Sequence, residues 1–497
     1  MENNKKSWKN WALFIGSLVI VFLLGLLVNS IVARKTEAKM AYSPNAQIGA
    51  NEPRNEVWGK FFPQEFESYM QTADTTFKSK YGGGAEHDVL AEDPNWVVLW
   101  AGYAFSKDYK QARGHYYAIE DINTTLRTGN GEGDKAQPST CWTCKSPDVP
   151  RLMNEIGVSN FYKGKWKDKG SQVVNPIGCG DCHDPKTMNL TITRPALKEA
   201  FAAMGKDITK ASHNEMRSLV CAQCHVEYYF DKHRPEPQNK DVAYLTFPWK
   251  NGLSVETMEK YYDSIQHVDF VNTISKTPIL KAQHPDWEIY TMGIHAQRGV
   301  SCADCHMPFK SEGGQKFTDH KIQSPLNNVA NSCQVCHREE KDVLVNNVYE
   351  RQDKLAENRK KLEGLLVKAH FEAKKAWELK ATDAEMKAIL QDIRHAQWRC
   401  DYIAASHGAS FHAPVESARI IASGIDIAQE ARIKLAKLLA SKGFTGEVAV
   451  PDISTKAKAQ AVIGLDMVKL VNEKIAFLKE IVPQWKAAAQ QRQAKMK

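Results

Sequence analysis

Ten of the eleven cysteines in this 497-residue chain stand in five pairs, with two residues between the members of each pair. Random placement of eleven cysteines would give about 0.2 such pairs, so the spacing is a chemical signal. Four pairs are followed directly by histidine, and the first is followed by Lys145. The pairs are Cys141 and Cys144, Cys179 and Cys182, Cys221 and Cys224, Cys302 and Cys305, and Cys333 and Cys336, and the histidines are His183, His225, His306 and His337.

A cysteine pair followed by histidine is the attachment signature of a c-type haem. The two thiols form thioethers with the porphyrin vinyl groups, and the adjacent histidine is placed to bind the iron from one side. The alternatives are a zinc site and a disulfide. Zinc sites usually draw four ligands from paired motifs within a compact module, and neither alternative explains four histidines that directly follow the cysteines. We therefore expect covalently bound haem.

Haems that only carry electrons are typically six-coordinate, so four such sites need four more strong ligands. The chain has sixteen histidines, which leaves twelve outside the motifs. Any one of these could instead be an ordinary surface or core histidine. Glycine-rich or motif-rich neighbourhoods favour His115, His284, His295, His320, His407 and His412.

Lysine in the ligand position of the first motif makes sense only if the iron binds a neutral amine, because a metal ligand must be deprotonated. Metal coordination and burial can both bring lysine to that state. The alternative is a degenerate motif that has no haem, or one that takes another residue as ligand. Cys400 lies outside the pairs and is expected to be a buried free thiol.

The chain begins with a candidate targeting segment. Lys5, Lys6 and Lys9 precede an apolar run from Trp11 to Ala33. The apolar part of a signal peptide usually has about 7–15 residues, whereas a membrane-spanning helix needs about 20. We therefore interpret residues 1–38 either as a cleaved signal peptide or as an uncleaved membrane anchor, and both export the rest of the chain.

The formal net charge of +8 would by itself suggest a protein that binds nucleic acid. Part of that charge lies in the lead segment. Each haem would also add two propionates, so five haems bring about ten carboxylates. The mature protein is then close to neutral, and we expect no nucleic-acid partner.

The sequence has no proline between Pro325 and Pro414, so long uninterrupted helices are possible there. Within this stretch five apolar residues recur at helical spacing and form an apolar stripe on one helix face, with charged and polar residues between them. We expect this stripe to be part of the core rather than a special interface. Its members are Leu344, Val348, Leu355, Leu362 and Leu366.

Helical patterns also cover about 383–407, 415–441 and 456–480. We therefore expect a mainly α-helical chain with little β-structure and long helices near its C-terminus. One haem-filled body is expected over 39–497, with a haem-binding part at about 39–340 and a long-helix part at about 341–497.

Several segments resemble the ammonia-forming cytochrome c nitrite reductases, a family of periplasmic pentahaem cytochromes. The lysine-bearing first motif is close to diagnostic of that family, and the match runs in order from about residue 55 to 420. The segments are Cys141–Lys145, Cys221–Phe230, Arg113–Ala118, Leu126–Gly129, Lys281–Pro285 and Ser410–Pro414.

The resemblance implies six-electron reduction of nitrite to ammonium at a haem held by Lys145, whose far side is open to substrate. Four bis-histidine haems would feed electrons to it. The resemblance also implies that Arg127, Tyr228 and His284 line the distal pocket. Arginine and a protonatable histidine suit an anion whose N–O bonds weaken, and His284 and Tyr228 are suitable proton-relay groups.

The resemblance also assigns the second iron ligands and a calcium ion beside the active haem. His407 is left without a ligand role. Oxygen-only ligation of the calcium suits a hard cation. The second ligands are His115 for the haem of His225, His320 for that of His183, His412 for that of His306 and His295 for that of His337, and the calcium ligands are Glu227, Tyr228 and Lys281 through their carboxylate or carbonyl oxygens and Gln283 through its side chain.

Finally, the resemblance implies a periplasmic homodimer whose electron donor is a membrane-bound, quinol-oxidising multihaem cytochrome. An uncleaved lead segment would tether the protein to the inner membrane. One alternative activity is reduction of sulfite, hydroxylamine or nitric oxide in the same pocket. A non-catalytic electron-transfer cytochrome, with every iron six-coordinate, is the alternative from another class, and a zinc-binding exported module is the third.

Overall fold

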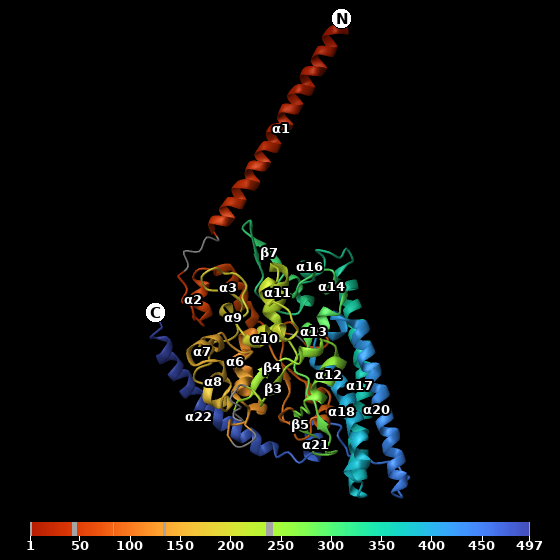
Figure 1. Cartoon of the computed structure of the whole chain (residues 1–497). Helices are drawn as coiled ribbons and strands as arrows, with labels where there is room; N and C mark the ends of the chain where they lie inside the picture. Colours follow the sequence, from red (N-terminus) through yellow and green to blue (C-terminus); the bar gives the residue numbers. More distant parts are fainter. Residues whose placement is uncertain (1, 42–46, 83, 133–135, 235–241, 497) are drawn as a thin grey trace. The chain divides into compact units, whose positions relative to one another are not determined.

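The computed structural model describes residues 2–41, 47–82, 84–132, 136–234 and 242–496. It contains two units, one of residues 1–48 with 311–316 and a body of residues 49–310 with 317–497. The first unit consists chiefly of α1 (Glu2–Ala41) (Figure 1). Within α1, Trp8–Lys35 has a mean hydropathy of 2.7 and is long and apolar enough to cross a membrane. Its length, composition and place fit a signal sequence or a membrane anchor.

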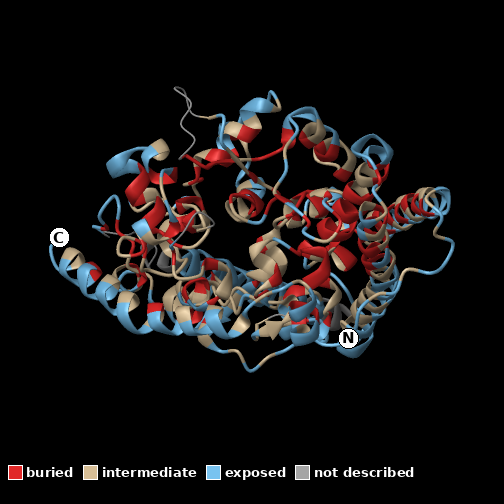
Figure 2. Cartoon of the chain, turned by 90° about the horizontal axis from the view of Figure 1, so that it is seen from below, coloured by how far each residue is buried: buried red, intermediate tan, exposed pale blue. Residues whose placement is uncertain are grey.

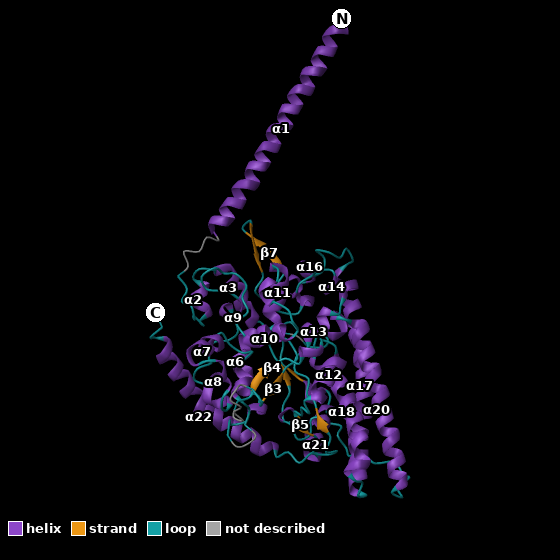
Figure 3. Ribbon diagram, viewed as in Figure 1, coloured by secondary structure: helices purple, strands orange, loops and turns teal. Residues whose placement is uncertain are grey.

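The body confirms the mainly α-helical fold (Figure 3). In the described ranges every sheet has only two strands, and the first three sheets along the chain are antiparallel, as in the register of Tyr229 opposite Thr246. The strands are β1 (His87–Asp88) with β2 (Lys110–Gln111), β3 (Tyr229–Asp231) with β4 (Tyr244–Thr246), β5 (Phe270–Val271) with β6 (Pro278–Ile279), and β7 (Phe309–Glu312) with β8 (Gln315–Thr318).

Short helices and turns make up most of the chain before residue 340. The 3-10 helices are η1 (Gln71–Ala73), η2 (Ala104–Ser106), η3 (His115–Tyr117), η4 (Leu126–Thr128), η5 (Ser139–Trp142), η6 (Trp166–Lys169), η7 (Ile208–Lys210), η8 (Trp249–Asn251) and η9 (Pro325–Asn327). The short α-helices are α2 (Asn55–Gly59), α3 (Pro63–Met70), α4 (Val89–Glu92), α5 (Asn95–Leu99), α6 (Ala118–Thr124), α7 (Asp148–Ile156), α8 (Val158–Tyr162), α9 (Cys179–Cys182), α10 (Pro195–Ala203), α11 (His213–Ala222), α12 (Val255–Ser264), α13 (Asp286–Thr291), α14 (Ile294–Gln297), α15 (Cys302–His306), α16 (Val329–Ser332), α19 (Ala409–His412) and α21 (Lys456–Val462).

Four long helices follow: α17 (Lys341–Glu378), α18 (Asp383–Ala405), α20 (Pro414–Ser441) and α22 (Met467–Gln493). Figure 1 shows α17, α18 and α20 side by side, and all three pack on one another. Local sequence explains where they begin. Thr382 and Glu385 form a reciprocal capping box at the start of α18, and Pro414 occupies the first turn of α20.

The pattern at 456–480 forms two helices rather than the one that the sequence predicts. The chain breaks between α21 and α22 because Gly464 takes a left-handed conformation with φ of 75°. Asp466 then begins α22, since its carboxylate accepts a hydrogen bond from the amide of Lys469.

The apolar stripe of α17 is core in only one half of the helix. Leu362 and Leu366 are fully buried, whereas Leu344, Val348 and Leu355 are only half-buried. The N-terminal half of α17 therefore has an apolar face that this chain leaves partly open.

Large aromatic side chains fill much of the core, and Figure 2 shows buried residues gathered in the interior of the body with exposed residues on its outer helices. Cys400 is fully buried and free, as expected. The fully buried tryptophans are Trp58, Trp96, Trp100, Trp142, Trp166, Trp249 and Trp398.

The close packing of α17, α18 and α20 predicts the effect of a methyl group at Gly424. A Cβ there would lie 2.7 Å from Cδ2 of Leu362 and 3.3 Å from Cβ of Arg399. We expect Gly424→Ala to lower the free energy of unfolding by about 1–2 kcal/mol through overpacking. Gly364→Ala is the control, since open space surrounds that helical glycine, and it should add about 0.5–1 kcal/mol. Equal stabilisation of both variants in denaturant unfolding would contradict this account.

Candidate haem and substrate site

Each cysteine motif forms about one helical turn. The amide of His183 donates to the carbonyl of Cys179 at 3.0 Å, and the amide of His225 donates in the same way to Cys221 at 2.9 Å. In α15, Ser301 and Asp304 form a capping box that fixes the start of the turn. Because residues three and four apart share a helix face, this turn places both thiols and the following side chain on one side.

The structure brings each motif histidine opposite one histidine from a distant segment. The four partners are the four that the family resemblance assigns as second ligands. The ring centres are 6.3 Å apart for His115 and His225, 6.2 Å for His183 and His320, 6.2 Å for His295 and His337, and 6.4 Å for His306 and His412.

These separations fit two imidazoles that bind one metal ion from opposite sides. With metal–nitrogen bonds of about 2.0–2.1 Å and a ring radius of about 1.1 Å, the ring centres would lie about 6.2–6.4 Å apart. Hydrogen bonds orient several of the rings for this role. Nδ1 of His183 donates to the carbonyl of Met188 at 2.8 Å, and Nδ1 of His306 donates to that of Gln323 at 2.8 Å. Nε2 is then free to bind the metal.

Burial favours the neutral form of several of these histidines, which is the form that binds a metal, whereas burial is outweighed at His225, where the Asp286 carboxylate raises the pKa. Burial lowers the pKa of His115 to about 3, with the charges of His225 and Lys145 adding to the effect. It also lowers the pKa of His183 and of His412 to about 4. The donor chemistry and the spacing of the residues therefore fit bis-histidine haem.

The described residues do not have the geometry that a zinc site or a disulfide needs. A zinc site needs about four ligands around one point, and in the described ranges no three His, Cys, Asp or Glu side chains gather in that way. All eleven cysteines are free.

Neighbouring cysteine motifs touch one another. The Cys224 thiol is close enough to lower the pKa of Cys144, and the Cys302 thiol is close enough to raise that of Cys221. The motifs at 141–145, 221–225 and 302–306 therefore lie in one contiguous row inside the body, although they are far apart in the sequence.

The charge of Lys145 acts on His284, as does that of the Asp286 carboxylate. Burial and the Lys145 charge both lower the pKa of His284 well below its usual value, and His407 contributes as a third partner. Burial raises the pKa of Tyr228 well above its usual value, so its phenol keeps its proton. The structure thus gathers Lys145, His284 and Tyr228 in one region, beside His407, to which the sequence assigns no role.

Arg127 stands on η4, a short turn that follows α6. Its Nε lies 3.3 Å from Oγ1 of Thr125, and its guanidinium carbon lies 4.5 Å from the ring centre of Phe105. Burial raises the pKa of the Cys141 thiol to about 11, and the Arg127 charge opposes part of that rise. No carboxylate in the described ranges forms an ion pair with Arg127, so its charge is available to an anion.

The expected calcium ligands also come together. Oε2 of Glu227 accepts from the amide of Gln283 at 2.6 Å, and the side-chain amide of Gln283 donates to the carbonyl of Lys281 at 3.0 Å. Glu227 is fully buried, and burial raises its pKa well above the usual value. A buried carboxylate beside amide and carbonyl oxygens is a donor set that calcium accepts, and such a cation would hold Glu227 ionised.

Several residues that support this region carry no signal in the sequence. Glu288 is fully buried; its Oε1 accepts from the amide of Glu227 at 2.8 Å, and burial raises its pKa to about 8. The Lys281 amine pairs with Asp401 at 3.0 Å. Asp286 lies 3.8 Å from Nδ1 of His225. These carboxylates are isolated in the sequence, and only the fold places them.

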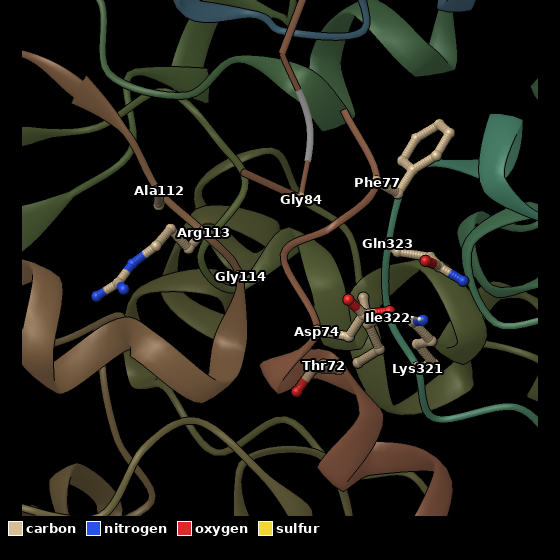
Figure 4. A pocket seen from close by; sticks show the side chains of 10 residues that line it. All are labelled: Thr72, Asp74, Phe77, Gly84, Ala112, Arg113, Gly114, Lys321, Ile322 and Gln323. Carbon is tan, nitrogen blue, oxygen red and sulfur yellow. Dashed lines mark hydrogen bonds and ion pairs between the residues drawn. The ribbon is translucent and has the colours of Figure 1, made fainter. Parts of the chain in front are cut away.

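A cavity of about 90 Å³ lies beside the segments that carry His115 and His320 (Figure 4). Its charged groups are already paired, since Arg113 contacts Asp121 at 2.7 Å and Lys321 contacts Asp74 at 3.0 Å. Figure 4 shows the Arg113 guanidinium directed away from Lys321. This cavity is therefore separate from the uncompensated cation at Arg127.

A helical body with five cysteine pairs and four facing histidine pairs defines a multihaem c-type cytochrome. The model of the cytochrome c552 family matches residues 54–495. The chain belongs to the cytochrome c552 family, which confirms the resemblance seen in its motifs.

Similar sequences and one solved structure support the same family assignment. A cytochrome c-552 of Bacteroides fragilis is 57% identical over the whole of both chains. One of Porphyromonas gingivalis is 55% identical over 97% of this chain and 96% of its own. A solved cytochrome c nitrite reductase from Desulfovibrio desulfuricans, described with two calcium sites, superposes with a TM-score of 0.72 and 29% identity over 89% of this chain and 96% of its own.

The tight approach of α14 to α19 yields a prediction for Gly293. A Cβ on this residue would collide with the carbonyl oxygen of His412. We expect Gly293→Ala to displace His412 and to lower the free energy of unfolding by about 1–3 kcal/mol. Thermal unfolding checks the stability, and the fraction of low-spin haem checks the histidine. Gly49→Ala, at a site with no close neighbours, is the control, and identical behaviour of the two variants would show the clash to be absent.

Proposed function

We propose that this protein reduces nitrite to ammonium with six electrons. The observation that carries the proposal is an uncompensated arginine beside the one cysteine motif that ends in lysine. Four motifs have a facing histidine on a distant segment, whereas the Cys141–Lys145 motif has Arg127, Tyr228 and His284 nearby instead. Support also comes from the similarity to a solved cytochrome c nitrite reductase.

Five covalently bound haem groups would be held by the five cysteine pairs. When bound, they would relay electrons from the donor to the substrate pocket beside Lys145. Lys145 would be the protein ligand of the iron at the first motif, and its amine has to be neutral to bind. His183, His225, His306 and His337, with their facing partners, would hold the other four irons.

The pocket side chains would bind the anion and deliver protons. The Arg127 guanidinium can donate two parallel hydrogen bonds to the nitrite oxygens. The Tyr228 hydroxyl, which keeps its proton, and the His284 ring can donate to those oxygens as they leave as water. The conversion consumes eight protons to give ammonium and two waters, so proton donors close to the substrate are required.

Calcium would be bound by Glu227, by the carbonyls of Tyr228 and Lys281, and by Gln283. The ion would compensate the buried Glu227 carboxylate and fix the segment from Lys281 to His284. It would also add positive charge near the anion site. The superposed nitrite reductase is described with two calcium sites, and our proposal concerns one.

The proposed function also includes an electron donor and a homodimeric assembly. We propose a periplasmic protein whose electrons come from a membrane-bound, quinol-oxidising multihaem cytochrome. The half-buried stripe at Leu344, Val348 and Leu355 supports a homodimer through the long helices, because a second copy would cover it. The lead segment would serve export, by cleavage or as a tether.

The direct test of the activity is the ammonium yield from nitrite. With purified protein and a reduced low-potential dye, we expect six dye electrons to be consumed for each ammonium formed. Lys145→Ala should abolish turnover and keep most of the haem spectrum. Sulfite or hydroxylamine turnover without nitrite turnover would support a different substrate, and a red protein with no turnover on any of these would support an electron carrier.

Replacing Arg127 by lysine keeps the charge and removes the fork geometry. We expect the apparent KM for nitrite to rise about tenfold, which corresponds to the loss of one hydrogen bond to a charged group. Arg419→Lys is the control, since Arg419 is a surface residue paired with Glu416. Wild-type kinetics in the Arg127 variant would show that another group binds the anion.

Replacing Glu227 by glutamine tests the calcium site. We expect the calcium content to fall from one ion per chain to a small fraction, because the only carboxylate ligand is lost. Elemental analysis measures the content, and nitrite turnover should fall with it. Glu447→Gln, at an exposed position, should keep its calcium, and full calcium retention in the Glu227 variant would place the ion elsewhere.

A further inference from the structure

The C-terminal helix α22 buries one lysine against the segment that carries Arg127. The Lys474 side chain is 3% exposed. Its amine donates to the carbonyl of Asn123 at 3.0 Å and to Oγ1 of Thr128 at 2.9 Å. Asn123 lies near the end of α6 and Thr128 ends η4, so the amine joins two points on either side of Arg127.

Asp108 holds the same segment through two further hydrogen bonds. Oδ2 of Asp108 accepts from Oγ1 of Thr125 and from the amide of Leu126, both at 3.0 Å. The Thr128 hydroxyl, which accepts from Lys474, lies 3.1 Å from the carbonyls of both Ile122 and Thr125. The Arg127 backbone is therefore fixed by the Asp108 carboxylate at the two residues before it and by the Lys474 amine at the residue after it.

Lys474 also contacts the wall of the Cys141–Lys145 motif. Its amine lies 5.6 Å from the ring centre of Trp166 and 4.9 Å from that of Phe477. Trp166 stacks on Trp142 with ring centres 5.2 Å apart and accepts a hydrogen bond from the Trp142 indole through its carbonyl at 2.8 Å. Trp142 lies inside the cysteine motif, so Lys474 is linked through Trp166 to the motif as well as to the Arg127 segment.

Burying the Lys474 amine costs hydration free energy, which its two hydrogen bonds have to offset. No carboxylate in the described ranges forms an ion pair with this amine. Burial lowers its pKa to about 7, and the Asp108 charge offsets part of that effect. A buried polar group without an ion-pair partner is retained only where its hydrogen bonds compensate for lost hydration, and both of these bonds go to the Arg127 segment.

We propose that Lys474 is a positioning residue of the anion pocket, which sets the place of the Arg127 guanidinium relative to the Cys141–Lys145 motif. The identity of the anion as nitrite rests on the proposed function, whereas the placement of the segment does not. Lys474 touches neither substrate nor haem in this proposal and acts through Thr128 and Asn123.

The test compares Lys474→Met with Lys479→Met. Both changes remove an amine from α22, but Lys479 is exposed. In Lys474→Met we expect the apparent KM for nitrite to rise about tenfold, with kcat within about twofold of wild type, because one charged hydrogen-bond donor is lost. Lys474→Gln, which still donates, should restore part of the affinity. Lys479→Met should match wild type.

Hydrogen exchange of the amides in 122–129 gives a readout that is independent of turnover. Exchange there should be faster in Lys474→Met and unchanged in Lys479→Met. Thr128→Val removes only the hydroxyl that accepts from Lys474, so it should also raise both the KM for nitrite and the exchange rate in 122–129. This variant keeps the proposal testable if Lys474→Met fails to fold.

Wild-type KM in folded Lys474→Met or Thr128→Val would overturn the proposal, as would a fall in kcat and haem content with unchanged KM. If the wild-type protein turns over no nitrite while exchange in 122–129 still rises only in the Lys474 and Thr128 variants, the proposed function fails and the positioning of the segment stands.

Discussion

Four pairs of facing imidazoles, with ring centres 6.2–6.4 Å apart, are the constraint on which the structure depends. Each pair joins segments that are distant in the sequence, such as His306 and His412. The short helices and turns before residue 340 place the motif histidines, and the long helices bring α19 back to them. Two imidazoles that shared one iron would each have to lie within a bond of about 2 Å from it, a requirement that the closely held short helices and turns around these rings would meet.

The fifth motif differs because its surroundings favour an anion. Arg127 has no carboxylate partner in the described ranges, and Tyr228 keeps its proton, whereas the acidic groups nearby are engaged elsewhere. Glu227 faces the amide of Gln283, and Asp401 pairs with Lys281. In the proposed function the arginine and tyrosine donors would face the substrate, while the Glu227 and Asp401 carboxylates are held by Gln283 and Lys281. Lys474 would extend this arrangement, since a residue of α22 holds the turn on which Arg127 stands.

Much of this could be predicted from the sequence, because covalent chemistry imposes fixed local spacing. Cysteine pairs followed by histidine identify the haem sites, and helical periodicity identifies α17, α18 and α20. Periodicity misses the break at Gly464, since a glycine within an otherwise helical pattern does not show whether it will take a left-handed conformation. The facing histidines come from the family resemblance, because any of twelve histidines could serve by composition. Glu288, Asp286 and Lys474 escape sequence reasoning for a related reason: only the fold reveals that a single charged residue is buried against a site far away in the chain.

In the proposed enzyme four irons have two histidine ligands each, and the fifth, at Lys145, has an open side. Electron paramagnetic resonance of the oxidised protein, with spins counted against total iron and protein, distinguishes the two kinds of iron. We expect five irons per chain, one for each cysteine pair, with four low-spin signals and one high-spin signal that changes when nitrite is added. Five low-spin irons that ignore nitrite, or only four irons per chain, would contradict this proposal.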